Sequence, residues 1–277
     1  MSATAAPARQ SRGLAVRVVP PVLLNGRRAG RLIERNAMVY RRAWVIVFSG
    51  FFEPVFYLLS VRLGLGDLVG GVSVGGRAVA YTTFAAPALL ASSAMNGAVY
   101  ESTMNIWFKL KHQRTYDGIL ATPMQPGDVA LGEITWCLMR GLLYAAGFLV
   151  VMLAMGLIES WWGLALLPGA VLIGFAFAAV GMAATSFMRS WQDFDLVQLA
   201  VLPLFLFSAT FYPLSTYPDG LEWVVRCTPL YQGVDLLRSL SLGVVGWDAL
   251  GHVAYLATMG LAGLTVTSRR LERLLLQ

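Results

Sequence analysis

Charged residues are scarce in this chain. Only 13% of its 277 residues are Asp, Glu, Lys or Arg, against roughly 25% in soluble domains, whereas 57% are hydrophobic. A water-soluble globule of this length needs more charge to cover its surface. The composition therefore argues against a soluble globular protein and favours one whose surface faces lipid.

Cysteine and histidine are equally rare. Cys137 and Cys227 are predicted on opposite sides of a membrane, which argues against a disulfide between them. His112 and His252 are far apart in the sequence, and neither stands near a pair of carboxylates. The sequence therefore indicates neither a metal cluster nor an enzyme centre. We expect no catalytic residue, no metal and no cofactor bound by this chain itself.

A nucleotide-binding motif is also missing. No Gly-x-x-x-x-Gly-Lys-[Ser/Thr] sequence occurs, and neither Lys109 nor Lys111 lies in such a context. If ATP energises the protein, hydrolysis must take place on a separate chain. The net charge of +6 does not indicate nucleic-acid binding, because the arginines gather at the ends of apolar segments, as membrane topology requires.

Long apolar runs dominate what is present. A helix that crosses a bilayer needs roughly 20 mainly apolar residues. Such runs occupy residues 44–61, 80–99, 134–158, 163–188, 196–212 and 249–268, of which the fifth is slightly short. We predict an all-α polytopic membrane protein with six transmembrane helices. Most of the arginines and both lysines then fall on the side of the N-terminus, so both termini are expected in the cytoplasm.

The segments outside these runs have characters of their own. Residues 1–30 are broken by proline and predict a flexible cytoplasmic N-terminus, and the transmembrane domain is expected to occupy 31–277. Residues 31–43 predict an amphipathic helix, which either lies in the headgroup plane or extends the first span. After the fifth span, 221–227 and 231–242 are too short to cross. We predict an external re-entrant helical hairpin there.

Three stretches carry a family resemblance. Residues 81–133 contain YTTFAAPALLASSAMNGAVYEST and WFKLKHQRTYDGILATPMQPGDVALGE, residues 53–66 read EPVFYLLSVRLGLG, and residues 212–243 read YPLSTYPDGLEWVVRCTPLYQGVDLLRSLSLG. The chain resembles, from about residue 30 onward, the type-2 family of ABC exporter permeases, closest to nodulation-type lipo-oligosaccharide and daunorubicin-resistance permeases. The ATPM block followed by Gly132 and Glu133 is the most specific part.

The resemblance implies the membrane-spanning subunit of an ATP-driven exporter in the bacterial inner membrane. Two such subunits, or one and a paralogue, would pair with two cytoplasmic ATPase subunits that bind ATP and Mg. The substrate would be amphipathic: a drug-like metabolite, a glycolipid or a lipid-linked saccharide. The alternative is an ion-coupled secondary transporter or channel, although no internal repeat is visible and Glu53 is the clearest charge within a span.

The resemblance also suggests where the function lies. Residues 109–128 are expected to couple the ATPase to the spans, unless they form an ordinary solvated loop. The residues expected at that interface are Lys109, His112, Arg114, Thr115, Tyr116, Asp117, Gly118, Ile119 and Leu120.

Other candidates come from the residues themselves. A carboxylate or arginine within or at the end of a span either forms a structural ion pair or acts as a gate or latch. These residues are Glu53, Glu101, Glu133 and Arg140. Phe205, Phe211 and Tyr212 line a candidate substrate exit, unless they belong to an interfacial aromatic belt.

Overall fold

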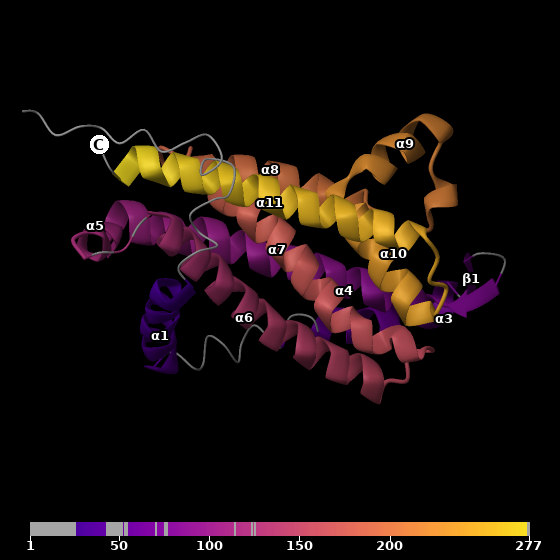
Figure 1. Ribbon diagram of the computed structural model, residues 1–277. Coiled ribbons are helices and arrows are strands. Elements are labelled where there is room, and N and C mark those ends of the chain that lie inside the picture. The colour runs from indigo at the N-terminus through magenta and orange to yellow at the C-terminus, as the bar shows by residue number, and fades with distance from the viewer. Residues whose placement is uncertain are drawn as a thin grey trace, which may run out of the picture.

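The computed structural model describes residues 26–42, 52, 55–69, 71–74, 77–113, 115–122, 124 and 126–275, and they are mainly helical. The long helices run side by side in one bundle, with α7 (Leu166–Thr185) packed against α4 (Tyr81–Tyr100), α6 (Pro126–Ala154) and α11 (Asp248–Leu275) (Figure 1). Small residues on α7 allow this close packing. A Cβ atom on Gly263 of α11 would lie only 2.8 Å from the backbone of Ala179.

The bundle has the surface of a membrane protein. Three of its helical segments, Gly127–Ala154, Trp161–Thr185 and Asp248–Leu274, are long and apolar enough to cross a bilayer, and Val55–Leu65 is a shorter apolar helix. In α6 and α11 these stretches turn many large apolar side chains outward, among them Leu143, Val150, Leu250 and Leu261. So extensive an apolar surface requires lipid around it, which confirms the prediction of an all-α, polytopic membrane protein.

The second and third predicted spans are longer than expected. The helix of α4 continues through two π-helical turns, η4 (Glu101–Asn105) and η5 (Phe108–His112). The short helix α5 (Thr115–Leu120) follows, and α6 begins at Pro126, where a missing N–H is tolerated. The described part of 107–132 is therefore largely helical, and α5 occupies Thr115–Leu120, where the sequence favours a short polar helix over an ordinary loop.

The predicted hairpin is present and the fifth predicted span is shorter. Helix α8 (Asp193–Leu206) ends before residues 207–212, and Ala209 has a φ of 54°. The chain passes through η7 (Leu214–Thr216) into α9 (Asp219–Cys227) and α10 (Pro229–Leu242). Thr228 caps α10 by accepting a hydrogen bond from the backbone N–H of Tyr231. We refer to α9 and α10 together as the α9–α10 hairpin.

A small antiparallel ribbon was not predicted. After the π-helical turn η3 (Val61–Leu65) and α3 (Gly66–Val69), strand β1 (Gly71–Val74) pairs with β2 (Arg77–Ala80), and Val72 lies opposite Val79. The signal was the alternation of valine with small or polar residues around the Gly75–Gly76 pair. It was missed because the surrounding apolar runs dominate the hydropathy pattern.

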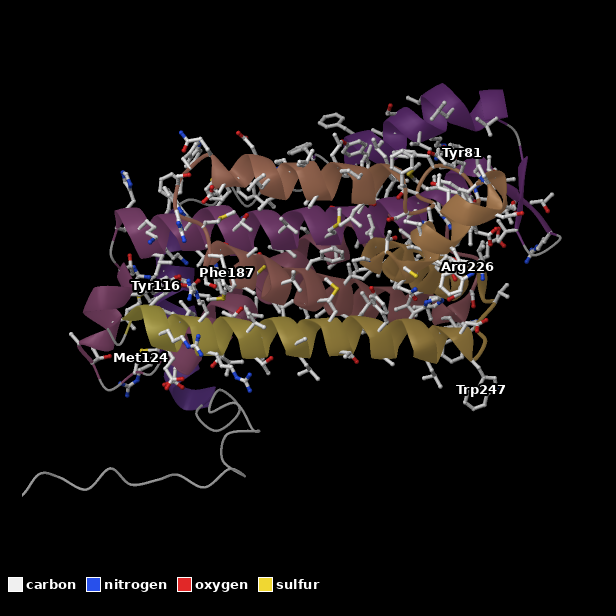
Figure 2. The ribbon with its side chains drawn as sticks, turned by 90° about the horizontal axis from the view of Figure 1, so that it is seen from above. Tyr81, Tyr116, Met124, Phe187, Arg226 and Trp247 are labelled. Carbon is white, nitrogen blue, oxygen red and sulfur yellow. The ribbon has the colours of Figure 1, made fainter. Side chains whose placement is uncertain are left out.

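The bundle has two chemically different ends. Tyr116, Met124 and Phe187 lie at one end, which we call the α5 end, and Tyr81, Arg226 and Trp247 lie at the other, the α9 end (Figure 2). The turn η6 (Trp161–Ala165) leads into α7 from α6, and the C-terminal end of α11 lies at the α5 end (Figure 1). Helix α1 (Gly26–Arg42) crosses the bundle near this end and begins earlier than the predicted residue 31 (Figure 1).

Candidate functional site: a polar junction at the α5 end and a mixed pocket between the helices

A single buried carboxylate joins several elements at the α5 end. Lys109 Nζ lies 2.7 Å from Glu133 Oε2, and Asn36 Nδ2 of α1 donates to the same oxygen at 3.2 Å. Tyr116 of α5 donates its hydroxyl to Glu133 Oε1 at 3.2 Å. A buried charge is tolerated when its lone pairs are satisfied in this way. Glu133 thus connects α1, η5, α5 and α6.

A second carboxylate lies nearby. Arg140 Nη1 of α6 pairs with Glu101 Oε2 at 2.5 Å, Asn105 Nδ2 donates to this oxygen at 2.6 Å, and Tyr40 donates its hydroxyl to Oε1 at 3.3 Å. The guanidinium of Arg140 also lies over the Tyr40 ring and donates to Tyr144. We call these two carboxylates and their partners the polar junction. It holds α1 against η4 and α6 at the α5 end.

The tyrosines of the polar junction are held in their neutral form. Burial, and then the charge of Glu133, raise the pKa of Tyr116 well above its usual range. Burial, and then Glu101, raise the pKa of Tyr40 to about 12. Both hydroxyl groups therefore remain hydrogen-bond donors to carboxylates at physiological pH.

Helix α5 stands out at the tip of the bundle (Figure 1). Its Tyr116 is only 1% exposed and packs in an apolar cluster with Leu32 of α1, Val129 and Ile134 of α6, and Leu271 of α11. Gly118, by contrast, is exposed. Tyr116 thus anchors the helix, Ile119 packs against the same cluster, and Gly118 lies on the exposed surface.

The predicted coupling residues are distributed unevenly. Thr115 and Ile119 are half-buried and His112 is exposed, whereas Lys109 is directed inward to Glu133 and offers no free charge to a partner. Arg114 and Glu53 lie outside the described residues, as do the side chains of Asp117 and Leu120. Of the four candidate ion-pair residues, the structure brings Arg140 to Glu101, while Glu133 has Lys109 instead.

Sequence reasoning missed several residues at this end. Asn36, Tyr40, Asn105 and Tyr144 contact the charged groups of the polar junction. An aromatic cluster also packs η5 against the start of α8, with ring centroids 5.1–5.8 Å apart. Its members are Trp107, Phe108, Trp191 and Phe194. The signal for the polar residues was a spacing of four, which places side chains on one helix surface: Asn36 with Tyr40, Glu101 with Asn105, and Arg140 with Tyr144.

At the α9 end a buried arginine supports an irregular segment. Arg238 of α10 donates to the carbonyl oxygens of Ala209 at 2.8 Å and Phe84 at 3.4 Å, and its guanidinium lies 3.9 Å from the centre of the Phe84 ring. Tyr81 donates to the Phe211 carbonyl at 3.0 Å. Non-helical backbone at membrane depth needs such partners. The hairpin and α4 thereby fix the chain as it leaves α8.

A shallow pocket with a mixed lining opens between α4, α6, α8 and the Val55–Leu65 helix. Its polar lining comes from Ser92, Ser93 and Asn96, and its apolar lining includes Leu89, Phe148 and Phe205. Tyr57 contributes both an apolar ring and a polar hydroxyl group. The ring of Phe205 meets that of Phe211 edge-on at 5.2 Å, whereas Tyr212 packs on Tyr217. Of the three predicted exit aromatics, Phe205 and Phe211 are in contact and only Phe205 lines this pocket.

The comparisons with known proteins agree with this architecture. The family model described as ABC-2 type transporter matches residues 29–242. The chain therefore belongs to the ABC-2 type transporter family, as its resemblance indicated, and is a membrane subunit of the kind that works with an ABC ATPase.

Curated relatives cover most of the chain. It is 33% identical over 246 residues to Nodulation protein J of Rhizobium leguminosarum bv. trifolii, an alignment that spans 88% of this chain and 92% of that protein. It is 30% identical over 212 residues to Nodulation protein J of Rhizobium meliloti (strain 1021), spanning 76% and 79% of the two chains. Nodulation protein J of Sinorhizobium fredii is 29% identical over 246 residues, spanning 88% and 92%.

Proposed function

We propose that this chain is the transmembrane subunit of an ATP-driven exporter that moves an amphipathic substrate across or out of the bacterial inner membrane. Two copies of a cytoplasmic ABC ATPase, carrying ATP and Mg, would energise it. A second copy of the permease, or a paralogue, would complete the pathway. The absence of a Gly-x-x-x-x-Gly-Lys-[Ser/Thr] sequence supports this division of labour, because nucleotide binding through that motif then requires a separate chain.

The connection of α5 to the polar junction carries the proposal. The exposed side of α5 offers a docking surface for a soluble partner, and the Tyr116 ring and hydroxyl attach the same helix to the bundle. A displacement of α5 would pull on Glu133, and through it on α1 and α6. A partner that binds at α5 can therefore move the spans without entering the membrane.

The charge distribution supports an orientation with both termini in the cytoplasm. Arg31, Lys111, Arg189, Arg269 and Arg273 are exposed on elements that meet at the α5 end. Trp161, Trp162, Trp223 and Trp247, 55–91% exposed, belong to turns and helices of the α9 end. Arginine and lysine gather on the cytoplasmic side, and tryptophan gathers at membrane interfaces. The α5 end would then face the cytoplasmic ATPase.

The mixed pocket supports an amphipathic substrate. Its described lining combines hydroxyl and amide groups with apolar side chains and has no charged side chain, which matches the mixed character of an amphipathic molecule. A glycolipid, a lipid-linked saccharide and a drug-like metabolite share that character. The names of the relatives, Nodulation protein J, associate similar chains with nodulation.

A bulky side chain on α5 tests the proposal. A Cβ atom at Gly118 meets nothing within 4 Å, so Gly118→Arg should leave the fold intact and block a partner that docks there. We expect the variant to lose co-purification with a co-expressed candidate ABC ATPase and to lose ATP-dependent transport in proteoliposomes. Gly220→Arg on α9, which also meets nothing within 4 Å, is the matched control and should retain both.

The outcome separates the two functional hypotheses. If the wild-type chain recruits no ATPase from native membranes and Gly118→Arg transports as well as wild type, the exporter proposal fails. An ion-coupled transporter would then be the better description, to be tested with imposed ion gradients.

A further inference from the structure

A histidine connects the last helix to the α9–α10 hairpin through both of its ring nitrogens. His252 lies in the second turn of α11, and its Nε2 lies 3.1 Å from Asp235 Oδ2 of α10. Its Nδ1 forms a hydrogen bond with Gln232 Oε1, also of α10. The imidazole is largely buried, with 12% of the side chain exposed.

The neighbouring contacts determine which of these atoms carry hydrogen. Gln232 Nε2 donates to the backbone carbonyl of Arg226 at 2.6 Å, and a carbonyl can only accept. The amide orientation is therefore fixed, and the oxygen of Gln232 faces the histidine as an acceptor. Ionised Asp235 is an acceptor as well. Opposite two acceptors, both ring nitrogens of His252 are satisfied together only when both carry hydrogen, which is the imidazolium form.

Helix α10 connects this contact with other elements of the α9 end. Asp235 and Arg238 are three residues apart and so lie side by side on one helix surface. Arg238 holds the irregular segment after α8 through the Ala209 carbonyl and holds α4 through Phe84. Tyr255 of α11 adds a second connection by donating to the carbonyl of Cys227 at 2.9 Å. The hairpin thus bridges α11 to α4 and to the segment after α8.

We propose that protonated His252 clamps the α9–α10 hairpin onto α11, and that loss of the proton releases it. A neutral imidazole has a single N–H and can satisfy only one of its two acceptors. Deprotonation therefore removes one hydrogen bond and the charge opposite Asp235. The clamp holds at low pH and is weakened as the pH rises. This device rests on side-chain geometry at the α9 end and does not depend on the exporter proposal.

Other charged groups near the clamp do not mimic this behaviour. Asp235 and Tyr231 face it from α10, and Arg226 and Glu222 of α9 are paired with each other at 2.6 Å. Asp248 and Tyr255 are the titratable neighbours on α11, and α7, which packs along α11, has no titratable side chain. Between about pH 5 and 8, histidine is the unperturbed side-chain type that changes charge.

Hydrogen exchange measures the clamp in the intact chain. We would reconstitute the full chain in lipid nanodiscs and follow amide exchange in peptides covering residues 219–242, corrected for the intrinsic effect of pH. Wild type should exchange about tenfold faster at pH 8 than at pH 5.5, the factor expected for losing one charge-assisted hydrogen bond. His252→Gln should remove this dependence. Tyr255→Phe should speed exchange equally at both pH values.

The two histidines of the chain permit a direct measurement of the proton. His112→Gln leaves His252 as the single histidine, so nitrogen NMR of a histidine-labelled sample reports that ring alone. Both ring nitrogens should be protonated at low pH, and hairpin exchange should accelerate over the same pH interval in which one of them loses its proton. The clamp would be overturned if the ring stays neutral at every pH, or if hairpin exchange does not change over the interval in which the ring loses its proton. A pH dependence of exchange that persists in His252→Gln would overturn it as well.

Discussion

The hydroxyl of Tyr116 lies 3.2 Å from Oε1 of Glu133, and this contact joins the outermost helix of the α5 end to the first turns of α6. Glu133 is buried and carries Lys109 and Asn36 on its other oxygen. Tyr116 is therefore the donor to Oε1, and the donors on Oε2 do not replace it. A movement of α5 changes the hydrogen bonding of this buried charge, so the contact can transmit a movement from the docking surface on α5 to the spans.

Removing this hydroxyl should impair coupling more than folding. Tyr116→Phe keeps the ring in its apolar cluster but deprives Glu133 Oε1 of its donor, at a cost of about 1–3 kcal/mol. We expect a lower melting temperature, normal insertion and a reduced ratio of substrate transported to ATP hydrolysed. Tyr100→Phe is the matched control, because Tyr100 is exposed, and it should change stability by less than about 0.5 kcal/mol. Unchanged transport stoichiometry in Tyr116→Phe would contradict the role of this contact.

The apolar runs and the proline positions predicted most of the fold, because a bilayer imposes a strict length on each spanning helix. The helices of the hairpin were predicted to within a few residues, because their apolar stretches are too short to cross the bilayer. The end of α8 was not, since the backbone beyond Leu206 is stabilised by Arg238, a residue far away in the sequence. Hydropathy carries no information about such long-range partners.

The polar junction was only partly predictable. Unfavourable charges at the ends of spans identified Glu101, Glu133 and Arg140 as residues that need partners. Which partner each acquires depends on how α1 crosses the bundle, and the spacing of residues along the chain does not determine that crossing. Lys109 was expected to face a partner protein, because the sequence does not show that Glu133 lies within its reach. The structure directs Lys109 to Glu133.

The buried ion pair of Glu101 and Arg140 should depend strongly on both members. Changing either Glu101→Gln or Arg140→Met alone leaves a charge without its counterpart, which typically costs about 3–5 kcal/mol. The double variant should be less destabilised than the sum of the single variants, as thermal unfolding in detergent would measure. The exposed pair of Arg77 and Glu159, 70% and 34% exposed, is the control. Breaking it should cost less than about 1 kcal/mol, and equal losses at the two pairs would contradict the argument.

Two glycines should respond oppositely to the same change. Gly263→Ala on α11 places a methyl group 2.8 Å from the backbone of α7, and such overpacking costs about 1–3 kcal/mol. Gly141→Ala on α6 meets nothing within 4 Å and should stabilise the helix by about 1 kcal/mol. Melting temperatures of the two variants in one detergent provide the comparison. Similar shifts in both would show that α7 and α11 do not approach as closely as described.

Alkaline pH should loosen α1 before the spans unfold. Because the pKa of Tyr40 is raised to about 12 from its usual 10, the stability it contributes is complete below pH 10 and is lost as the pH rises through 12. An ionised Tyr40 would face Glu101 as a second negative charge and could no longer donate to it. Unfolding free energy should therefore fall steeply from pH 10 to 12 in wild type, while Tyr40→Phe starts lower and falls less. Proteolysis of α1 in nanodiscs should rise over the same interval. If both chains have the same slope, the neutral hydroxyl of Tyr40 does not hold α1 to the bundle.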